Sequence, residues 1–272
     1  MKKLIVLTDL HITAPGERII GLDPSARLQS VLEAALGAHP DAEAMILMGD
    51  LTHHGTVEEY AQLRRLLEFV SIPICAMVGN HDRREAFLQV FPETPVTASG
   101  HVQQVRDVGP DHRLICLDTL DGPPYPAGHH AGRLCAARQS WLDDALWGAS
   151  ERVPLVFAHH PPFRTGLPGM DEIMLEDGDR ILERLAQAPR AHLFCGHVHR
   201  TISGSSRGVP WSMFKSTCHQ APLDLVTVDS SLSIDEPAAY GLLLLTSDGV
   251  VAHSEDVGLE AAVARDGLSA SA

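Results

Sequence analysis

The chain has 272 residues, of which 21 are Lys or Arg, 35 are Asp or Glu and 16 are His, so its formal net charge is −14 at pH 7. With 44% apolar and 21% charged residues it has a globular composition, which excludes a disordered or fibrous chain. No apolar run approaches the roughly 18 residues of a membrane span, and the acidic charge without Lys/Arg clusters opposes binding to nucleic acid or to an anionic membrane.

The N-terminus and the cysteines both indicate a cytoplasmic protein. The apolar stretch that begins at Leu4 ends before Thr8, short of the roughly 7 to 15 residues of the apolar core of a signal peptide. The 5 cysteines include no C-x-x-C pair, and their odd number argues against a closed set of disulfides. We therefore expect reduced thiols and residence in the cytoplasm.

Apolar, β-branched runs alternate with helical patterns through the first two thirds of the chain. The predicted strands are Lys3–Thr8, Ala44–Met48, Pro73–Val78, Arg113–Asp118, Pro154–His159 and Ala191–Cys195. The predicted helices are Ser25–Ala38, Thr56–Val70, Ala136–Trp147 and Glu176–Ala188, with apolar residues at helical spacing. This alternation predicts an α/β fold with a mostly parallel sheet covered by helices.

After Thr201 the pattern changes to short strands joined by turns. The strands predicted there are Thr201–Ser206, Val209–Lys215, Tyr240–Thr246 and Val250–Ser254. An antiparallel portion should therefore follow the parallel one. We expect residues 1–258 to form a single domain, and residues 259–272, which have little to bury, to be a flexible tail or a subunit contact.

Polar clusters directly follow five of the predicted strands. They are Asp9-Leu10-His11, Gly49-Asp50-Leu51, Gly79-Asn80-His81-Asp82, His159-His160-Pro161-Pro162 and Gly196-His197-Val198-His199. Because the carboxyl ends of the strands in an open α/β sheet share one edge, these side chains should converge there on a ligand. Residues i and i+2 of an extended segment point the same way, so Asp9 should act with His11, and His197 with His199.

The clusters contain seven candidate metal ligands and no thiolate. They are Asp9, His11, Asp50, Asn80, His159, His197 and His199. One metal ion would not use so many, and a carboxylate can bridge two cations, so we expect Asp50 to join two divalent ions roughly 3.5–4 Å apart. Such ligands admit Mn, Fe, Zn or Co. Two ions, two carboxylates and one hydroxide leave one net positive charge, which a phosphodiester anion neutralises.

The motifs D-x-H, G-D, G-N-H-D, a single H and G-H-x-H, in this order over residues 9–199, resemble the calcineurin-like metallophosphoesterase superfamily. The resemblance is closest to bacterial class III cyclic-nucleotide phosphodiesterases and glycerophosphodiesterases. It extends to Gly55-x-x-Glu58-Glu59-Tyr60, to Gly132-x-Leu134 with Gln139-x-Trp141-Leu142, and to Ser216-Thr217-Cys218-His219-Gln220. It implies two stacked mixed β-sheets flanked by helices, and a homo-oligomer.

The resemblance also implies a role for each matching residue. Asp9, His11, Asp50 and His199 would hold the first metal, and Asp50, Asn80, His159 and His197 the second. His81 would be a catalytic residue that faces the substrate phosphate rather than a metal. Ser/Thr phosphatases of the superfamily follow G-D with D-R-G, whereas this chain has Leu51-Thr52-His53-His54-Gly55. The missing arginine favours a small diester, with one negative charge, over a phosphoprotein monoester.

Further histidines could line a substrate pocket, namely His53, His54, His129, His130 and His219. An exposed loop position explains each of them at least as well, and we retain His219 and His53 as candidate substrate-binding residues. His160 fits packing beside Pro161 as well as it fits a supporting role in the site. Cys195 is expected to be a buried strand thiol rather than a metal ligand.

The leading hypothesis is a dinuclear metal-dependent phosphodiesterase, in which a metal-bound hydroxide attacks phosphorus and His81 assists the leaving alkoxide. Cyclic nucleotides, glycerophosphodiesters and cyclic sugar phosphates are all candidate substrates. The alternatives are a phosphomonoesterase or a nuclease of the same superfamily, and an inert, metal-poor binding module on the same fold. The absence of a basic stripe opposes the nuclease, and the complete ligand set opposes the inert module.

Overall fold

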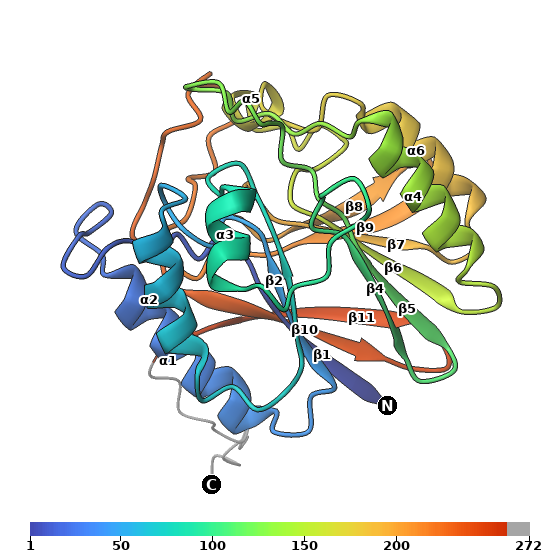
Figure 1. Cartoon of the computed structure of the whole chain (residues 1–272), viewed down its shortest axis with the longest axis horizontal. Helices are drawn as coiled ribbons and strands as arrows, with labels where there is room; N and C mark the ends of the chain where they lie inside the picture. Colours follow the sequence, from blue (N-terminus) through green and yellow to red (C-terminus); the bar gives the residue numbers. More distant parts are fainter. Residues whose placement is uncertain (260–272) are drawn as a thin grey trace, which may run out of the picture.

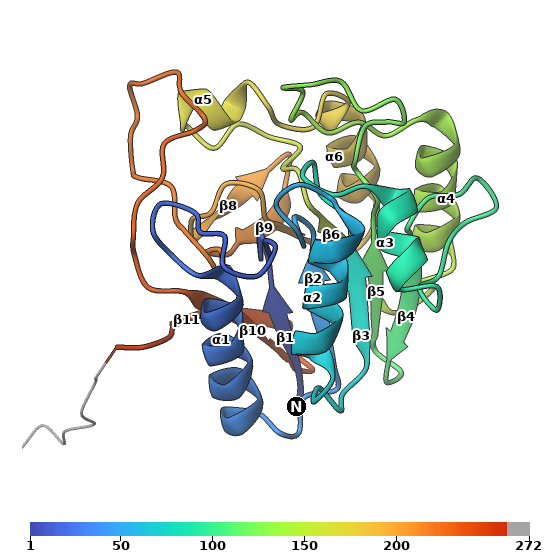
Figure 2. The same cartoon turned by 60° about the vertical axis from the view of Figure 1, so that its left-hand side comes forward.

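The computed structural model describes residues 1–259, so the expected tail of residues 259–272 lies outside the described residues except for Leu259. Two mixed β-sheets stack face to face, with helices on both outer faces (Figure 1, Figure 2). The predicted α/β architecture of two stacked sheets flanked by helices is confirmed.

The first sheet has the strand order β11-β10-β1-β2-β3. Its strands are β1 (Lys2–Leu7), β2 (Ala44–Met48), β3 (Ile74–Met77), β10 (Ala239–Leu245) and β11 (Val250–Asp256). β1, β2 and β3 run parallel, whereas β10 is antiparallel to both of its neighbours. All five residues of β2 are buried, which explains why its sequence is continuously apolar.

The second sheet has the strand order β4-β5-β6-β7-β9-β8. Its strands are β4 (Gln104–Val108), β5 (His112–Cys116), β6 (Val153–Ala158), β7 (His192–Cys195), β8 (Ile202–Ser206) and β9 (Val209–Met213). The four central strands are parallel, and β4 and β8 pair antiparallel with their neighbours at the two edges. Antiparallel pairing is therefore not confined to the C-terminal portion. β4 was not predicted because its three middle residues are exposed and two of them, Arg106 and Asp107, are charged.

The helices are α1 (Pro24–Ala38), α2 (Val57–Leu67), α3 (Arg84–Val90), α4 (Ala136–Trp147), α5 (Pro168–Asp171) and α6 (Gly178–Gln187). α1, α2 and α3 pack on the first sheet, and α4 and α6 pack on the second (Figure 1). α2 begins with a capping box formed by Thr56 and Glu59. The sequence did not predict α3 and α5, which have 7 and 4 residues. Among the described residues, none of the helices combines the length and apolar character needed to cross a bilayer.

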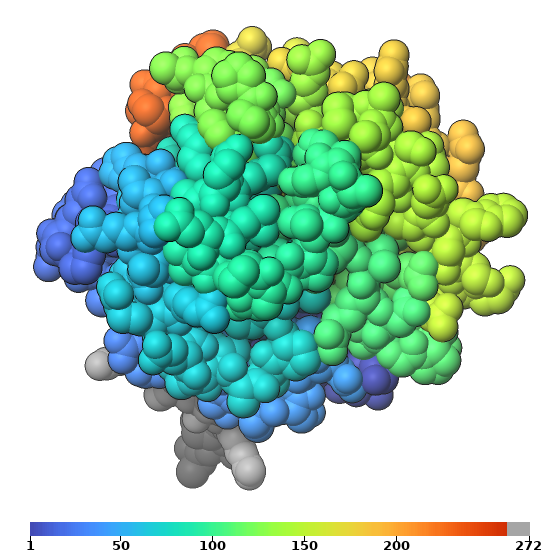
Figure 3. Space-filling model, in the orientation of Figure 1, coloured from blue at the N-terminus to red at the C-terminus, as the bar shows by residue number. Residues whose placement is uncertain are grey.

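A third apolar cluster lies between the two sheets and includes Leu4, Ile46 and Phe157. The stacking brings the carboxyl ends of β1, β2, β3, β6 and β7 to one end of the molecule, the upper end in Figure 2. In Figure 3 the green residues around 120–132 lie at this same end, above the blue-green surface around α3. The loops that carry the predicted ligands therefore come together at one end.

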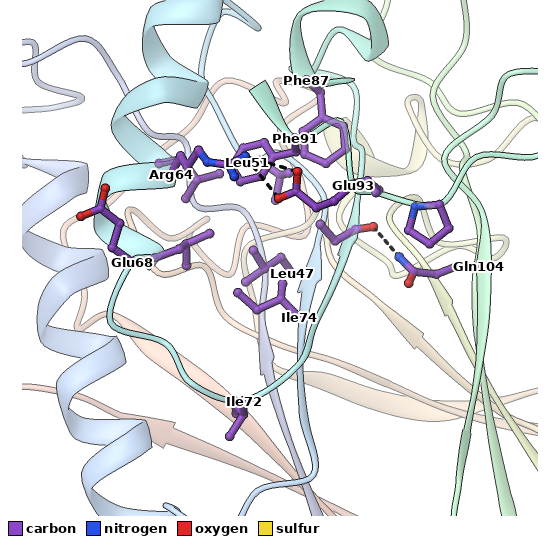
Figure 4. A pocket seen from close by; sticks show the side chains of 15 residues that line it. Leu47, Leu51, Arg64, Glu68, Ile72, Ile74, Phe87, Phe91, Glu93 and Gln104 are labelled. Carbon is purple, nitrogen blue, oxygen red and sulfur yellow. Dashed lines mark hydrogen bonds and ion pairs between the residues drawn. The ribbon is translucent and has the colours of Figure 1, made fainter. Parts of the chain in front are cut away.

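An apolar pocket of about 400 Å³ lies on the outer side of β3, beneath α2 and α3 (Figure 4). Leu47 and Phe87 line it, and the ion pair of Arg64 with Glu93, at 3.2 Å, lies beside it. Its lining residues include none of the predicted ligands, so it is separate from the site described next.

Candidate metal centre

A second pocket, of about 370 Å³, lies at the carboxyl ends of the strands. Five of the seven predicted ligands line it, namely His11, Asp50, Asn80, His197 and His199. The other two, Asp9 and His159, are fully buried beside them. The structure thus brings all seven side chains to one place, although they come from loops that follow five different strands.

Three of the predicted ligands for the first metal point their polar atoms at one another. His11 Nε2 lies 3.1 Å from His199 Nε2, and His199 Nε2 lies 3.3 Å from Asp9 Oδ1. Asp50 Oδ2 is 3.8 Å from His11 Nε2. These four residues are the set that the resemblance assigns to one ion.

The predicted ligands for the second metal converge on the other side of Asp50. His159 Nε2 lies 3.3 Å from Asp50 Oδ2 and 3.2 Å from Asn80 Oδ1. The ring of His197 lies edge-on to that of His159, with 5.2 Å between centroids. One carboxylate oxygen, Oδ2 of Asp50, therefore faces both groups, as a bridging ligand must.

Hydrogen bonds on the far sides of the imidazoles fix which nitrogen faces inward. His159 Nδ1 donates to Met48 O at 3.0 Å, and His199 Nδ1 donates to His219 O at 2.8 Å. His197 Nε2 donates to Ile173 O at 3.1 Å. In the neutral rings of His159 and His199 the remaining nitrogen, Nε2, is an acceptor, and it faces oxygens of Asp50 and Asn80 or of Asp9. Acceptors that face one another in this way can be bridged by a cation or by a proton.

Glycine at position 79 leaves room for that cation. A Cβ atom at Gly79 would lie 2.3 Å from Asp50 Oδ1 and 2.7 Å from His159 Nε2. At Gly49, whose φ is +92°, a Cβ would lie 2.6 Å from His159 Nδ1. Any side chain at these positions would fill the space between the ligands.

The electrostatics of the cluster keep its carboxylates ionised. Burial acts to raise the pKa of Asp50, but His159 and His81 hold it well below its ordinary value. Burial acts to lower the pKa of His159, but the carboxylates of Asp50 and Asp9 raise it to about 9. A proton on His159 therefore neutralises part of the negative charge that a metal ion would otherwise neutralise. Burial and the neighbouring His81 lower the pKa of His11 well below its ordinary value.

The ligand segments are not extended, so the expectation that Asp9 acts with His11, and His197 with His199, through the alternation of a strand is wrong. β1 ends at Leu7, before these residues, and β7 ends at Cys195. All four have positive φ, of 53° and 47° for Asp9 and His11 and of 70° and 52° for His197 and His199. Left-handed turns aim these side chains, at a cost of about 1–2 kcal/mol per residue. Backbone bonds from Asp9 N to Gly49 O and from His11 N to Asp50 O hold this conformation.

Asp82 ties two of the ligand loops together, a role that our sequence analysis missed. Its buried carboxylate accepts hydrogen bonds from Gly79 N at 2.8 Å, Leu51 N at 3.1 Å and the Tyr60 hydroxyl at 2.8 Å. Burial, with the nearby Asp50 charge, raises the pKa of Asp82 to about 6. Asp82 ends the G-N-H-D motif and Tyr60 ends the G-x-x-E-E-Y stretch, so the signal was present in both motifs.

His81 lies beside the ligand cluster with one ring nitrogen free. Its backbone N–H donates to Asp50 Oδ1 at 2.8 Å, and its ring Nδ1 donates to His53 O at 2.8 Å. Nε2 is therefore left for a substrate, in the pocket that His81 lines. The role of His81 toward the substrate phosphate stays a prediction, and this orientation is compatible with it.

The two candidate substrate-binding histidines also line this pocket. His53 stacks on His81, and burial lowers its pKa to about 4. His219 has a buried Nδ1 without a hydrogen-bond partner, and burial lowers its pKa to about 3. Two other histidines lie elsewhere, because His54 pairs with Glu59 and His129 with Asp121.

The outer part of the pocket comes from segments that contain none of the predicted motifs. They are Ile19 and Ile20 after β1, Met170 and Ile173 around α5, and residues 230–233. No Lys or Arg is among the lining residues of this pocket. The pocket is therefore histidine-rich at its base and apolar or hydroxylic above.

Comparison with known proteins gives an independent result. The model of the calcineurin-like phosphoesterase family matches residues 2–201. The chain is 41% identical over 253 residues to a protein of Rhodopseudomonas palustris named "Probable cyclic nucleotide phosphodiesterase", covering 92% of this chain and 91% of that protein. It is 29% identical over 220 residues to a glycerophosphodiester phosphodiesterase of Enterobacter lignolyticus, covering 79% of this chain and 77% of that protein.

Among solved structures, the fold is similar to that of a purple acid phosphatase from yellow lupin, with a TM-score of 0.67 and 13% identity. The similarity covers 94% of this chain and 51% of the lupin chain. At this identity the comparison bears on the fold alone.

Proposed function

This chain belongs to the calcineurin-like phosphoesterase family, and on that premise we propose that it is a dinuclear metal-dependent phosphodiesterase that hydrolyses small phosphodiesters. The observation that carries the proposal is the convergence of Asp50 Oδ2 and Asn80 Oδ1 within 3.3 Å of His159 Nε2, beside a second group around His11. The names of the two relatives, a cyclic nucleotide phosphodiesterase and a glycerophosphodiester phosphodiesterase, support the same substrate class.

Asp9, His11, Asp50 and His199 would hold one divalent ion, and Asp50, Asn80, His159 and His197 the other. Bound there, two ions of Mn, Fe, Zn or Co would supply Lewis acidity toward the phosphoryl oxygens and acidify a water molecule. Asp50 links the two ligand groups, because its Oδ2 faces both of them. The backbone N–H of His81 fixes Asp50 by donating to its Oδ1.

His81 is the residue we propose for the leaving group. With Nδ1–H engaged by His53 O at 2.8 Å, only Nε2 can exchange a proton with a substrate. A protonated His81 would donate from Nε2 to the leaving alkoxide oxygen, which then departs as an alcohol. His53 and His219 line the same pocket and are the proposed contacts for the rest of the substrate.

The charge of the pocket supports a diester rather than a monoester. Two divalent ions with two carboxylates and a hydroxide leave one positive charge, which matches a diester monoanion. Within residues 1–259, no Lys or Arg lines the pocket to balance the second charge of a monoester. Cyclic nucleotides, glycerophosphodiesters and cyclic sugar phosphates all satisfy this requirement.

A substrate panel with metal-reconstituted enzyme tests the proposal. It contains 3′,5′- and 2′,3′-cyclic nucleotides, glycerophosphodiesters, cyclic ribose phosphates and a monoester control. We expect bis(p-nitrophenyl) phosphate to be hydrolysed with a higher kcat/KM than the p-nitrophenyl monoester at pH 7 to 8. A higher value for the monoester with the same metals would identify a phosphatase, and degradation of plasmid DNA would identify a nuclease.

We also propose that residues 1–258 form one domain, that the protein resides in the cytoplasm and that it forms a homo-oligomer. The five cysteines are free thiols, as a reducing compartment requires. Leu223, Leu225, Val226 and Val228 are 62–85% exposed beside the pocket segment, an unusual density of exposed apolar side chains. Light scattering on the purified protein measures the mass of the assembly.

A further inference from the structure

One side chain outside the ligand set reaches the proposed second metal group. His130 lies on the loop that connects β5 to α4, and its Nδ1 is 3.0 Å from Asn80 Nδ2. An amide NH₂ can only donate, so His130 Nδ1 accepts. The opposite atom of the same amide, Oδ1, then points to His159 Nε2 at 3.2 Å.

The orientation of this amide matters because its two ends are chemically opposite. Oδ1 can ligate a cation, whereas a flipped Asn80 would present NH₂ hydrogens to it. The second partner of Asn80, His159, can donate to Oδ1 only while its Nε2 carries a proton. Once a cation displaces that proton, Nε2 is an acceptor and no longer selects the useful orientation of the amide. The acceptor on His130 makes that choice.

His130 is itself held by a buried histidine. His160 Nε2 donates to His130 O at 3.1 Å, and His160 Nδ1 accepts from the Thr119 hydroxyl at 2.7 Å. Both ring nitrogens of His160 are thus engaged, so it is not a ligand although it follows His159. A Cβ at Gly132 would lie 2.4 Å from His160 Cγ, so the loop backbone packs directly on this ring.

We infer that His130 is a positioning residue that orients the Asn80 amide toward the second metal, and that His160 and Thr119 anchor the loop on which it lies. The inference rests on the proposed dinuclear site. It predicts that removing the acceptor on His130 weakens binding at the Asn80 group by roughly 10–100-fold, the usual effect of losing an outer partner of a metal ligand. Binding at the Asp9 group is unchanged.

Two variants with side chains of similar length distinguish the effect of the hydrogen-bond acceptor from the effect of side-chain shape. In His130→Asn, Oδ1 occupies the position of Nδ1 and accepts the same hydrogen bond, whereas His130→Leu places a methyl group there. Calorimetric titration of the metal-free protein with Mn²⁺, without substrate, should show two binding steps in wild type and in His130→Asn. In His130→Leu the step assigned to the Asn80 group should be weakened and the other step retained.

The outcomes distinguish this inference from the proposed function. If wild type binds fewer than two Mn²⁺ ions, the dinuclear proposal fails. If wild type binds two ions and the two variants do not differ, because both bind like wild type or both lose affinity equally, the orienting role of His130 is wrong. The stacking of His130 on His81, with 5.3 Å between ring centroids, would then indicate a role in substrate binding instead. His160→Gln, which keeps the donor to His130 O, should retain more affinity than His160→Met, which lacks it.

Discussion

The floor and the rim of the histidine-lined pocket are built in opposite ways. The floor, defined as Asp9, His11, Asp50, Asn80, His159, His197 and His199, has every residue at most 8% exposed. The rim, defined as Ile19, Ile20, Met170, Ile173 and residues 230–233, comes from connections between the strands and includes Ile20 at 51% exposure.

The two regions are also held by different forces. Three floor histidines, His159, His197 and His199, are each fixed by a hydrogen bond from the outer ring nitrogen to a carbonyl, as in the 3.0 Å bond of His159 to Met48 O. The rim segment around Ser231 is held by local bonds such as that from Ser231 N to Asp229 at 2.9 Å. We therefore propose that the floor determines the reaction, and that changes in the rim alter substrate preference without altering the fold.

The largest effect is expected from removing the shared ligand of the floor. Asp50→Ala should reduce hydrolysis of the diester to the uncatalysed background and lower the total metal content, because Asp50 Oδ2 faces both ligand groups. Asp9→Ala is the matched control and should weaken chiefly one site. Metal analysis that finds two ions per chain in Asp50→Ala would contradict the bridging role.

The next effect concerns His81, which lies beside the floor and is not expected to bind metal. His81→Ala should lose roughly 10²–10⁴-fold in kcat, the usual contribution of one general acid, and keep both metals. The loss should shrink for p-nitrophenolate, which needs little protonation, and persist for the alkoxides of glycerol or ribose. Steady-state rates with both leaving groups measure it. Equal losses for both, or loss of metal, would refute the proton transfer.

The charge of the floor makes metal binding depend on pH. In the protein without metal the Asp50 and Asp9 carboxylates raise the pKa of His159 to about 9, so a cation must displace this proton at neutral pH. Apparent affinity should therefore rise with pH by up to about tenfold per unit below pH 9 and level off above it. Calorimetry with Mn²⁺ at pH 7, 8 and 9, in buffers of different ionisation enthalpy, detects the released proton. An affinity that stays constant over this range, without proton release, would exclude the competition.

The raised pKa of His159 also makes the stability of the metal-free protein depend on pH. The pKa of His159 is about 9 in the folded state, against about 6.5 for an unperturbed histidine. The stabilisation from this proton is therefore complete below about pH 6.5 and is lost as pH rises toward 9. Thermal unfolding without metal should accordingly shift to lower temperature over this window, and saturating metal should abolish the shift.

The smallest effect is expected at the rim. Ile20 and Gly21 both have positive φ, of 46° and 86°, in a turn closed by the bonds between Ile19 and Leu22. Asn-Gly suits such a turn, whereas a β-branched residue is strained there. Ile20→Asn should raise the free energy of unfolding by about 0.5–1 kcal/mol and raise KM several-fold for substrates with an apolar leaving group, with kcat unchanged.

Val226→Asn is the control for this variant, because Val226 is 85% exposed and does not line the pocket. It should leave KM unchanged. If Ile20→Asn is more stable and has the wild-type KM for every substrate of the panel, the rim does not select the substrate at this position.

Much of this protein could be predicted from its sequence. Periodicity placed most strands and helices within one or two residues, as for Ala44–Met48 and Ala136–Trp147, whose predicted and observed bounds agree. The seven ligand positions could be found because each belongs to a short motif after an apolar run. The periodicity of apolar residues did not predict α3, α5 and β4, because short or exposed elements lack a periodic apolar signal.

The tertiary structure alone decided how those residues are aimed and what surrounds them. Local pattern suggested extended ligand segments, but the backbone turns left-handed at Asp9 and His197, where bonds from other loops compensate the strain. The inward nitrogen of His159 depends on the carbonyl of Met48, 111 positions away, which only the stacking of two sheets brings within 3.0 Å. The acceptor for Asn80 on His130, and the rim around Ile20, likewise depend on contacts between distant loops. A sequence pattern reports what neighbours along the chain prefer, whereas these features are fixed by partners that meet only in the folded protein.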